Sequence, residues 1–150
     1  MQLARVLFPV FIEISCMTDA EATIDKSTTT KPLVYVVDDE AMLLELATVI
    51  LEPLGYEIAT FRDPEEALEA FTHAHRRPAL LITDYAMHSM NGMDLIHGCR
   101  RLEPQQKVLL LSGTVGPEIF HQAAHKPDQF LAKPYHARQL IELVKGMLSS

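Results

Sequence analysis

Four short, mostly apolar segments constrain the fold of this chain more than any other feature. They span residues 33–37, 79–83, 108–111 and 129–132, and in them apolar side chains follow one another without polar alternation. Such segments are typical of strands in a parallel sheet, because helices cover both faces of that sheet. From Lys31 onward the chain alternates strand and helix. The sequence therefore predicts an α/β fold built on a parallel sheet.

The segments between these strands have the pattern of covering helices. Residues 40–54 place apolar side chains on one face at helical spacing, and Pro53 and Gly55 then end the helix. A short edge strand and four more helices are predicted over residues 56–60, and over residues 63–73, 93–102, 117 to about 124, and 136–148. Right-handed crossovers then give a flavodoxin-like, five-stranded parallel sheet of order 2-1-3-4-5, doubly wound by five helices.

Each of the four mostly apolar strands leads directly into a reactive polar residue. In chain order these residues are Asp38 with Asp39, then Asp84, Ser112 and Lys133. Open parallel sheets bind their ligands at the carboxyl ends of the strands. Three carboxylates, a hydroxyl and an ammonium are therefore predicted to meet in one shallow pocket.

The charges of this pocket indicate its chemistry. Crowded carboxylates either take up protons or bind a cation, and carboxylate oxygens supplemented by water suit Mg²⁺. The cation and Lys133 would attract a phosphoryl group, whose transfer needs positioning and charge neutralisation more than an elaborate base. Asp84 can act as the nucleophile and become an aspartyl phosphate. Ser112 can donate a hydrogen bond to a phosphoryl oxygen, and Gly113 leaves space for the phosphate.

Four motifs carry a resemblance to a known family: Val36–Glu40, Thr83–Met87 followed by Asn91 and Gly92, Leu111–Gly113, and Phe130–Tyr135. They occur in the order, and near the spacing, of receiver domains in two-component response regulators. Any one motif would be weak evidence, whereas four in register on a repeated strand–helix pattern are specific. The resemblance covers about residues 32–149. The chain is similar to a stand-alone receiver of the chemotaxis-regulator type.

The resemblance implies how this site would accept phosphate. Asp84 would be the phosphoacceptor, and Asp38 and Asp39 would be the acidic pair that binds Mg²⁺ beside it. The backbone carbonyl of Ala86 would be a further ligand to the metal. The implied function is Mg²⁺-dependent uptake of a phosphoryl group, followed by signalling through protein–protein interaction. Such a protein catalyses its own phosphorylation and slow dephosphorylation, and is not otherwise an enzyme.

The resemblance also implies how the phosphate would be sensed. Ser112 would be the switch hydroxyl, Lys133 the lysine that bridges to the phosphate, and Phe130 the switch aromatic. Because Phe130 replaces a frequent tyrosine, it cannot make a phenolic hydrogen bond when it turns inward. His88 stands where the family usually has proline, so we expect a more mobile loop or a histidine that approaches the phosphate. The positions that tune phosphate lifetime in the family hold Ala86 and Thr114.

Partners and compartment follow from the resemblance and from composition. The phosphodonor would be a histidine kinase or a histidine phosphotransfer protein, and the target an unidentified downstream protein. A net charge of −7, spread along the chain, argues against nucleic-acid binding. Two cysteines, Cys16 and Cys99, favour a reducing compartment, and no segment is long enough to cross a membrane. We therefore expect a cytoplasmic protein with no membrane partner, either a monomer or a weak dimer.

The first thirty-one residues differ from residues 32–150, the predicted receiver domain. Leu3–Cys16 is apolar and faintly resembles a secretory signal, but Pro9 and Glu13 interrupt it and no clear cleavage site follows. We favour Met17 as the true start, with a weak membrane-surface or partner-docking segment as the alternative. Residues 17–31 lack periodicity and predict a disordered leader. The chain ends after its last predicted helix, so no output domain is expected.

Simpler interpretations exist for each site residue, and two other functions compete. The acidic residues could be caps, Ser112 a turn residue, Lys133 a surface lysine and Phe130 a static core residue. A haloacid-dehalogenase-type phosphatase would need a second aspartate two residues after its nucleophile, where this chain has Ala86. A receiver-like module that is never phosphorylated would be free to lose Asp39, Asp84, Ser112 and Lys133, which are all present.

Histidines could also suggest a metal site. His121 and His125 lie one helical turn apart on the predicted fourth helix, and His73 and His75 flank a helix end. No cysteine or acidic cluster completes either pair along the sequence, so we interpret them as solvated surface side chains.

Overall fold

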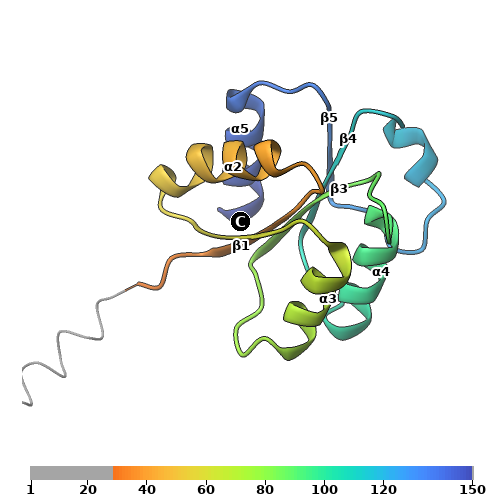
Figure 1. The fold of residues 1–150 in the computed structure, drawn as a ribbon, viewed down its shortest axis with the longest axis horizontal. Coiled ribbons are helices and arrows are strands. Elements are labelled where there is room, and N and C mark those ends of the chain that lie inside the picture. Colours follow the sequence, from red (N-terminus) through yellow and green to blue (C-terminus); the bar gives the residue numbers. More distant parts are fainter. Residues whose placement is uncertain (1–28, 150) are drawn as a thin grey trace, which may run out of the picture. The chain divides into compact units, whose positions relative to one another are not determined.

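A five-stranded parallel sheet forms the centre of the computed structural model, which describes residues 29–149 (Figure 1). Its strands are β1 (Leu33–Val37), β2 (Glu57–Phe61), β3 (Leu80–Asp84), β4 (Val108–Ser112) and β5 (Gln129–Ala132). Their order is β2-β1-β3-β4-β5, and every neighbouring pair is parallel. The predicted fold class and strand order are therefore confirmed, with the second strand one residue later than predicted.

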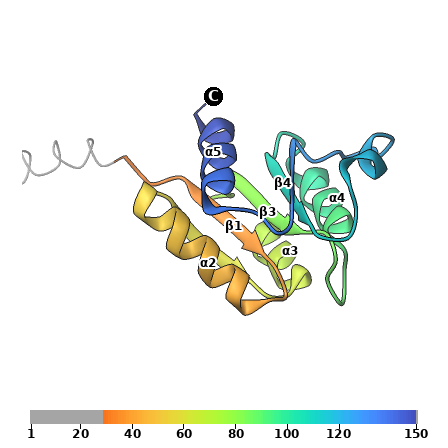
Figure 2. The same cartoon turned by 90° about the horizontal axis from the view of Figure 1, so that it is seen from above.

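Within residues 29–149, four α-helices cover the sheet in two layers: α2 (Ala41–Leu51), α3 (Pro64–His73), α4 (Gly92–Leu102) and α5 (Ala137–Leu148). Helices α2 and α5 lie on one face, and α3 and α4 lie on the other (Figures 1 and 2). Each face has its own core, in which β3 contributes Leu80 and Ile82 to the first and Leu81 to the second. Because β3 is buried on both faces, its sequence is apolar almost throughout.

The register of the sheet brings the ends of its strands to one edge. Val37 pairs with both Phe61 and Thr83, so Asp38 follows β1 at the level where β3 ends. Asp84 pairs with Leu111, and Ser112 with Ala132. The polar residues that follow or close β1, β3, β4 and β5 therefore share the carboxyl edge of the sheet, as predicted.

Capping residues fix where two of the helices start. The side chain of Asp63 accepts a hydrogen bond from Glu65 N at 2.9 Å, and Pro64 opens α3. Asn91 caps α4 in the same way, accepting from Asp94 N at 2.9 Å. These caps set the start of each helix close to the carboxyl edge of the sheet.

The predicted fourth helix, over 117 to about 124, is wrong. The segment forms one short 3₁₀ helix, η3 (Pro117–Phe120), and continues as turns to β5. Phe120 is buried, but Ile119 is exposed and only alanines follow at helical spacing. So little apolar burial does not offset the cost of nucleating a helix. The first predicted helix also ends early, in the 3₁₀ turn η2 (Glu52–Leu54).

Most of the predicted leader, residues 1–31, lies outside the described residues. Residues 31–149 belong to one compact unit, Lys31–Ser150. None of their helices combines the length and the hydropathy needed to cross a membrane.

Candidate phosphoacceptor site

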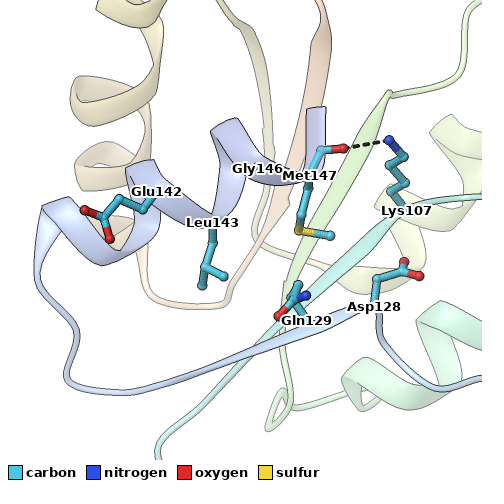
Figure 3. A pocket seen from close by; sticks show the side chains of 7 residues that line it. All are labelled: Lys107, Asp128, Gln129, Glu142, Leu143, Gly146 and Met147. Carbon is cyan, nitrogen blue, oxygen red and sulfur yellow. Dashed lines mark hydrogen bonds between the residues drawn. The ribbon is translucent and has the colours of Figure 1, made fainter. Parts of the chain in front are cut away.

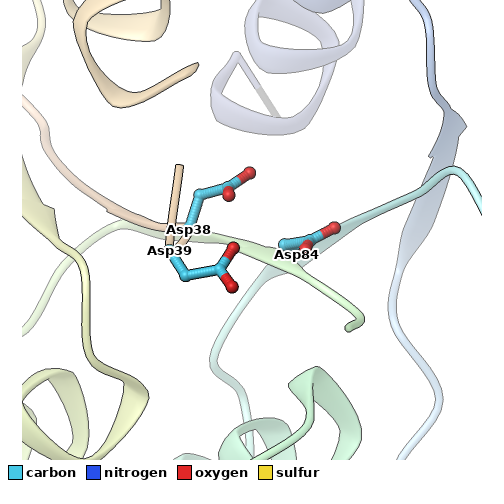
Figure 4. Close-up of side chains that lie close together, drawn as sticks. All are labelled: Asp38, Asp39 and Asp84. Carbon is cyan, nitrogen blue, oxygen red and sulfur yellow. The ribbon is translucent and has the colours of Figure 1, made fainter. Parts of the chain in front are cut away.

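Three carboxylates gather at the carboxyl edge of the sheet. Asp38 and Asp39 follow β1, Asp84 ends β3, and one oxygen from each lies within 4.8 Å of the others (Figure 4). Asp38 and Asp84 are buried, whereas Asp39 is partly exposed. Within residues 29–149, no other three His, Cys, Asp or Glu side chains lie close enough to hold a metal ion. The sequence prediction that these three aspartates meet is therefore confirmed.

Lys133 crosses from the end of β5 to this cluster. Its Nζ lies 2.9 Å from Asp38 Oδ2 and 3.0 Å from Asp84 Oδ1. Burial by itself would lower the pKa of Lys133, but its hydrogen bonds to Asp38 and Asp84 raise that pKa above its usual range. The ammonium is therefore firmly charged at neutral pH. It joins the two buried carboxylates, which would otherwise repel each other.

One lysine does not neutralise three carboxylates. Burial raises the pKa of Asp84, and although Lys133 opposes this effect, the neighbouring Asp38 adds to it. An ionised Asp84 in this environment gains from a further cation. The available donors are carboxylate oxygens on a partly open edge, which match the ligand preference of Mg²⁺. The residues present thus fit the predicted metal.

Ser112 and Phe130 lie on the side of the site formed by β4 and β5. The Ser112 hydroxyl accepts hydrogen bonds from Thr114 N at 3.2 Å and from Val115 N at 3.1 Å. It is thus engaged with the backbone that follows β4. Phe130 is half-buried, and its ring centroid lies 6.0 Å from that of Phe120. Phe120 in turn contacts Tyr85, the residue after Asp84, at 5.7 Å. These three rings link the end of β3 with β5.

The loop that follows β3 carries His88 and Ala86 beside the cluster. His88 Nε2 lies 3.3 Å from Asp39 Oδ2, and the histidine side chain is 95% exposed. The structure thus places His88 at the outer rim of the acidic cluster. Ala86 is exposed in the same loop, which is closed by a 2.8 Å hydrogen bond from Gly92 N to Tyr85 O.

Sequence reasoning missed Arg62. This residue directly follows β2, and its Nε and Nη2 donate to the backbone carbonyl of Asp39 at 3.3 and 3.2 Å. The contact supports the peptide that carries an acidic side chain of the cluster. The rule that found Lys133, a polar residue directly after a strand, finds Arg62 only once β2 is known to end at Phe61, one residue later than predicted.

A cavity lies away from the acidic cluster. A hollow of about 410 Å³ opens between α5 and the starts of β4 and β5, and Lys107, Asp128 and Gln129 are part of its lining (Figure 3). Lys107 Nζ donates to the carbonyl of Met147 at 2.6 Å across it. The starts of parallel strands lie at the edge opposite the acidic cluster, so this hollow does not belong to the site.

Comparisons with known proteins agree with this geometry. The family model described as response regulator receiver domain matches residues 34–145. The DNA-binding response regulator MtrA of Mycobacterium tuberculosis is 28% identical over 120 residues, covering 80% of this chain and 52% of MtrA. The probable transcriptional regulatory protein TcrX of the same species is 30% identical, covering 77% and 49%. The chain thus spans about half the length of these curated relatives.

Solved structures give the same result. A response regulator receiver domain protein from Clostridium thermocellum superposes with a TM-score of 0.72 at 26% identity, covering 79% of this chain and 94% of that one. A CheY-like receiver protein from Methanospirillum hungatei gives the same four values. The family match extends over most of the chain and includes all the residues of the acidic cluster. The chain therefore belongs to the response regulator receiver domain family, whose members act in two-component signal transduction.

Proposed function

We propose that this chain accepts a phosphoryl group on Asp84 from the phosphohistidine of a kinase or a histidine phosphotransfer protein. The observation that carries this proposal is the meeting of Asp38, Asp39 and Asp84 within 4.8 Å, with Lys133 Nζ 3.0 Å from Asp84. Asp38, Asp39, Asp84 and the backbone carbonyl of Ala86 would hold Mg²⁺, which neutralises charge on the phosphoryl oxygens when it is bound.

The proposed transfer forms one bond and breaks one. A carboxylate oxygen of Asp84 attacks phosphorus, the P–N bond of the phosphohistidine breaks, and the electron pair stays on the imidazole of the donor. Lys133 already spans Asp38 and Asp84, so a short movement lets it contact the new phosphoryl oxygens. Ser112 donates its hydroxyl hydrogen to another of these oxygens. Hydrolysis of the aspartyl phosphate later restores the carboxylate.

The face of α2 next to the site suits the phosphodonor. Met42 is 81% exposed and Leu46 is 44% exposed, although both are apolar. A hollow of about 400 Å³ lined by Leu43, Leu46 and the Lys133–Tyr135 segment lies between this helix and the site. Exposed apolar side chains around a hollow are typical of a protein-binding surface. A donor that docks there would present its phosphohistidine to Asp84.

The proposed output is contact with another protein. The net charge of −7 disfavours binding of this chain to nucleic acid, so the DNA binding named for MtrA is assigned to that protein alone. Phosphate on Asp84 would recruit Ser112, and Phe130 would follow it and repack the surface around η3 and β5. We further propose a cytoplasmic regulator that is a monomer or a weak dimer.

The test is incubation with Mg²⁺ and a small phosphodonor such as acetyl phosphate. We expect a hydroxylamine-sensitive phosphate on the wild type and none on Asp84→Asn, because an amide is not a competent nucleophile. Asp94→Asn, an exposed aspartate on α4, is the matched control and should be phosphorylated normally. Continuous turnover of the donor would indicate a phosphatase, and no reaction would indicate an unphosphorylated module. Phosphate retained on Asp84→Asn would contradict the assignment of the acceptor.

A further inference from the structure

Two histidines outside the acidic cluster lie in contact. His97 is on α4, and His125 is in the segment between η3 and β5. Their ring centroids are 4.7 Å apart, and the ring planes meet at 61°. The sequence predicts that His125 and His121 lie on one helix. Because that helix does not form beyond Phe120, His125 instead meets a histidine from another element.

This spacing suits a shared metal ion. Imidazole nitrogens bind Zn²⁺ at about 2.0–2.1 Å with tetrahedral angles, which places two ring centroids roughly 5 Å apart. The observed separation of 4.7 Å is close to that value. His97 is exposed and His125 half-buried, so small rotations can aim a nitrogen of each ring at one point while water reaches the remaining coordination positions.

The local structure holds the two rings together before any ligand binds. Arg100, one turn after His97, donates to the backbone carbonyls of Gln106 and Lys126, and its guanidinium lies 2.8 Å from Asp128 Oδ2. The Arg100 side chain is only 11% exposed. The bonds to Lys126 and Asp128 attach the segment that follows His125 to α4, one turn after His97. Such preorganisation lowers the entropic cost of binding. The ion pair with Asp128 also offsets the positive charge of Arg100.

We propose that His97 and His125 form a site for a late first-row divalent cation such as Zn²⁺. Imidazole ligands favour Zn²⁺, Cu²⁺ and Ni²⁺, whereas Mg²⁺ prefers oxygen ligands and keeps its waters. The site is therefore chemically distinct from the carboxylate cluster around Asp84. It is a surface site with two protein ligands, and it bridges α4 to the segment that leads into β5.

Calorimetric titration of untagged full-length protein with ZnCl₂ in excess Mg²⁺ tests this site. We expect His97→Asn and His125→Asn each to weaken binding at least about tenfold, because even the loss of a partner outside the ligand sphere costs about 10–100-fold. His121→Asn, an exposed histidine near the site, and His88→Asn, at the rim of the acidic cluster, are matched controls that should leave the affinity unchanged.

Three outcomes would overturn the proposal. The first is unchanged affinity in both His97→Asn and His125→Asn, and the second is equal losses in all four variants. The third is a loss confined to His88→Asn, which would place the cation at the carboxylates instead. A second measurement needs no variant: substoichiometric Cu²⁺ should broaden the NMR signals of residues near His97 and His125 first. Broadening that begins elsewhere would also refute the site.

Discussion

Ser112 shows how a single hydroxyl can couple chemistry to signalling. In the structure it accepts from Thr114 N and Val115 N, contacts that movement towards a phosphoryl oxygen would exchange for a bond to a charged oxygen. A hydrogen bond to a charged group is worth about 1.5–3 kcal/mol, and each neutral one about 0.5–1.5 kcal/mol. Ser112 would lose two neutral hydrogen bonds and gain one to a charged oxygen, and water can replace the bond lost at the exposed Thr114. The free energies of the two positions of the hydroxyl are therefore close to each other.

We expect Ser112→Ala to accept phosphate but to respond weakly. Amide NMR shifts of residues 115–135 on adding beryllofluoride should be large in the wild type and small in this variant. Thr114→Ala retains the Ser112 hydroxyl and serves as the control with a full response. Shifts of equal size in Ser112→Ala and the wild type would show that the signal leaves by another route, such as the His88 loop.

Cys99 is expected to be chemically inert despite being a thiol. It is 1% exposed on α4, and burial raises its pKa to about 12. At pH 8 about one molecule in ten thousand would then carry the reactive thiolate. In a Cys16→Ser background, a thiol reagent at pH 8 should therefore label the protein only after denaturant is added. Rapid labelling of the folded protein would mean that α4 opens readily or that the thiol is not buried.

Most of the site residues could be predicted from the sequence because their positions follow from the order of the strands. Asp38, Asp39, Asp84 and Lys133 each follow or close a strand, so the parallel topology brings them together whatever the details of packing. The contacts that could not be predicted depend on side-chain direction. Examples are the approach of His88 to Asp39 and the bonds of Ser112 to its own loop.

At the scale of elements, a close approach of backbone to backbone ties α4 to the site. Gly92 opens α4, and a Cβ there would overlap the backbone carbonyl of Asp84. We expect Gly92→Ala to lower the free energy of unfolding by about 1–3 kcal/mol, the usual cost of overpacking. It should also slow phosphoryl uptake, because the displaced carbonyl belongs to the proposed acceptor.

Gly146 provides the matched comparison for Gly92. It lies inside α5, and a Cβ at this position meets no atom within 4 Å. Gly146→Ala should therefore raise the free energy of unfolding by about 0.5–1 kcal/mol, since alanine loses less chain entropy than glycine in a helix. Urea denaturation measures both variants. Equal changes in the free energy of unfolding of the two variants would show that the close approach of Gly92 to Asp84 does not affect stability.

The elements that the sequence predicted well are those that bury a full apolar face. Helices α3 and α5 end where predicted, because caps mark α3 and a long apolar stripe marks α5. The prediction of a helix over 117–124 was wrong because Phe120 alone buries an apolar side chain there. The residues that follow this segment are held by contacts with another element, the Arg100 bonds to Lys126 and Asp128, which no local pattern encodes.

At the scale of the whole molecule, the buried Asp84 carboxyl makes the stability of the fold depend on pH. Burial raises the pKa of Asp84, so the folded chain binds more protons than the unfolded chain between the ordinary value of about 3.9 and the raised value. The free energy of unfolding therefore falls as pH rises through that window. Above the raised pKa the full cost of holding an ionised Asp84 is present.

We expect metal-free Asp84→Asn to melt at a higher temperature than the wild type at pH 7, because the amide resembles the neutral carboxyl. The difference should shrink as pH is lowered towards 4, where Asp84 in the wild type takes up its proton. Adding Mg²⁺ should raise the melting temperature of the wild type more than that of the variant, since a ligand stabilises the state that binds it. Glu69→Gln removes an exposed carboxylate from α3 and should behave like the wild type in every condition. If Asp84→Asn were less stable than the wild type without metal, the ion pair with Lys133 would outweigh burial, and the acidic cluster would stabilise the fold rather than strain it.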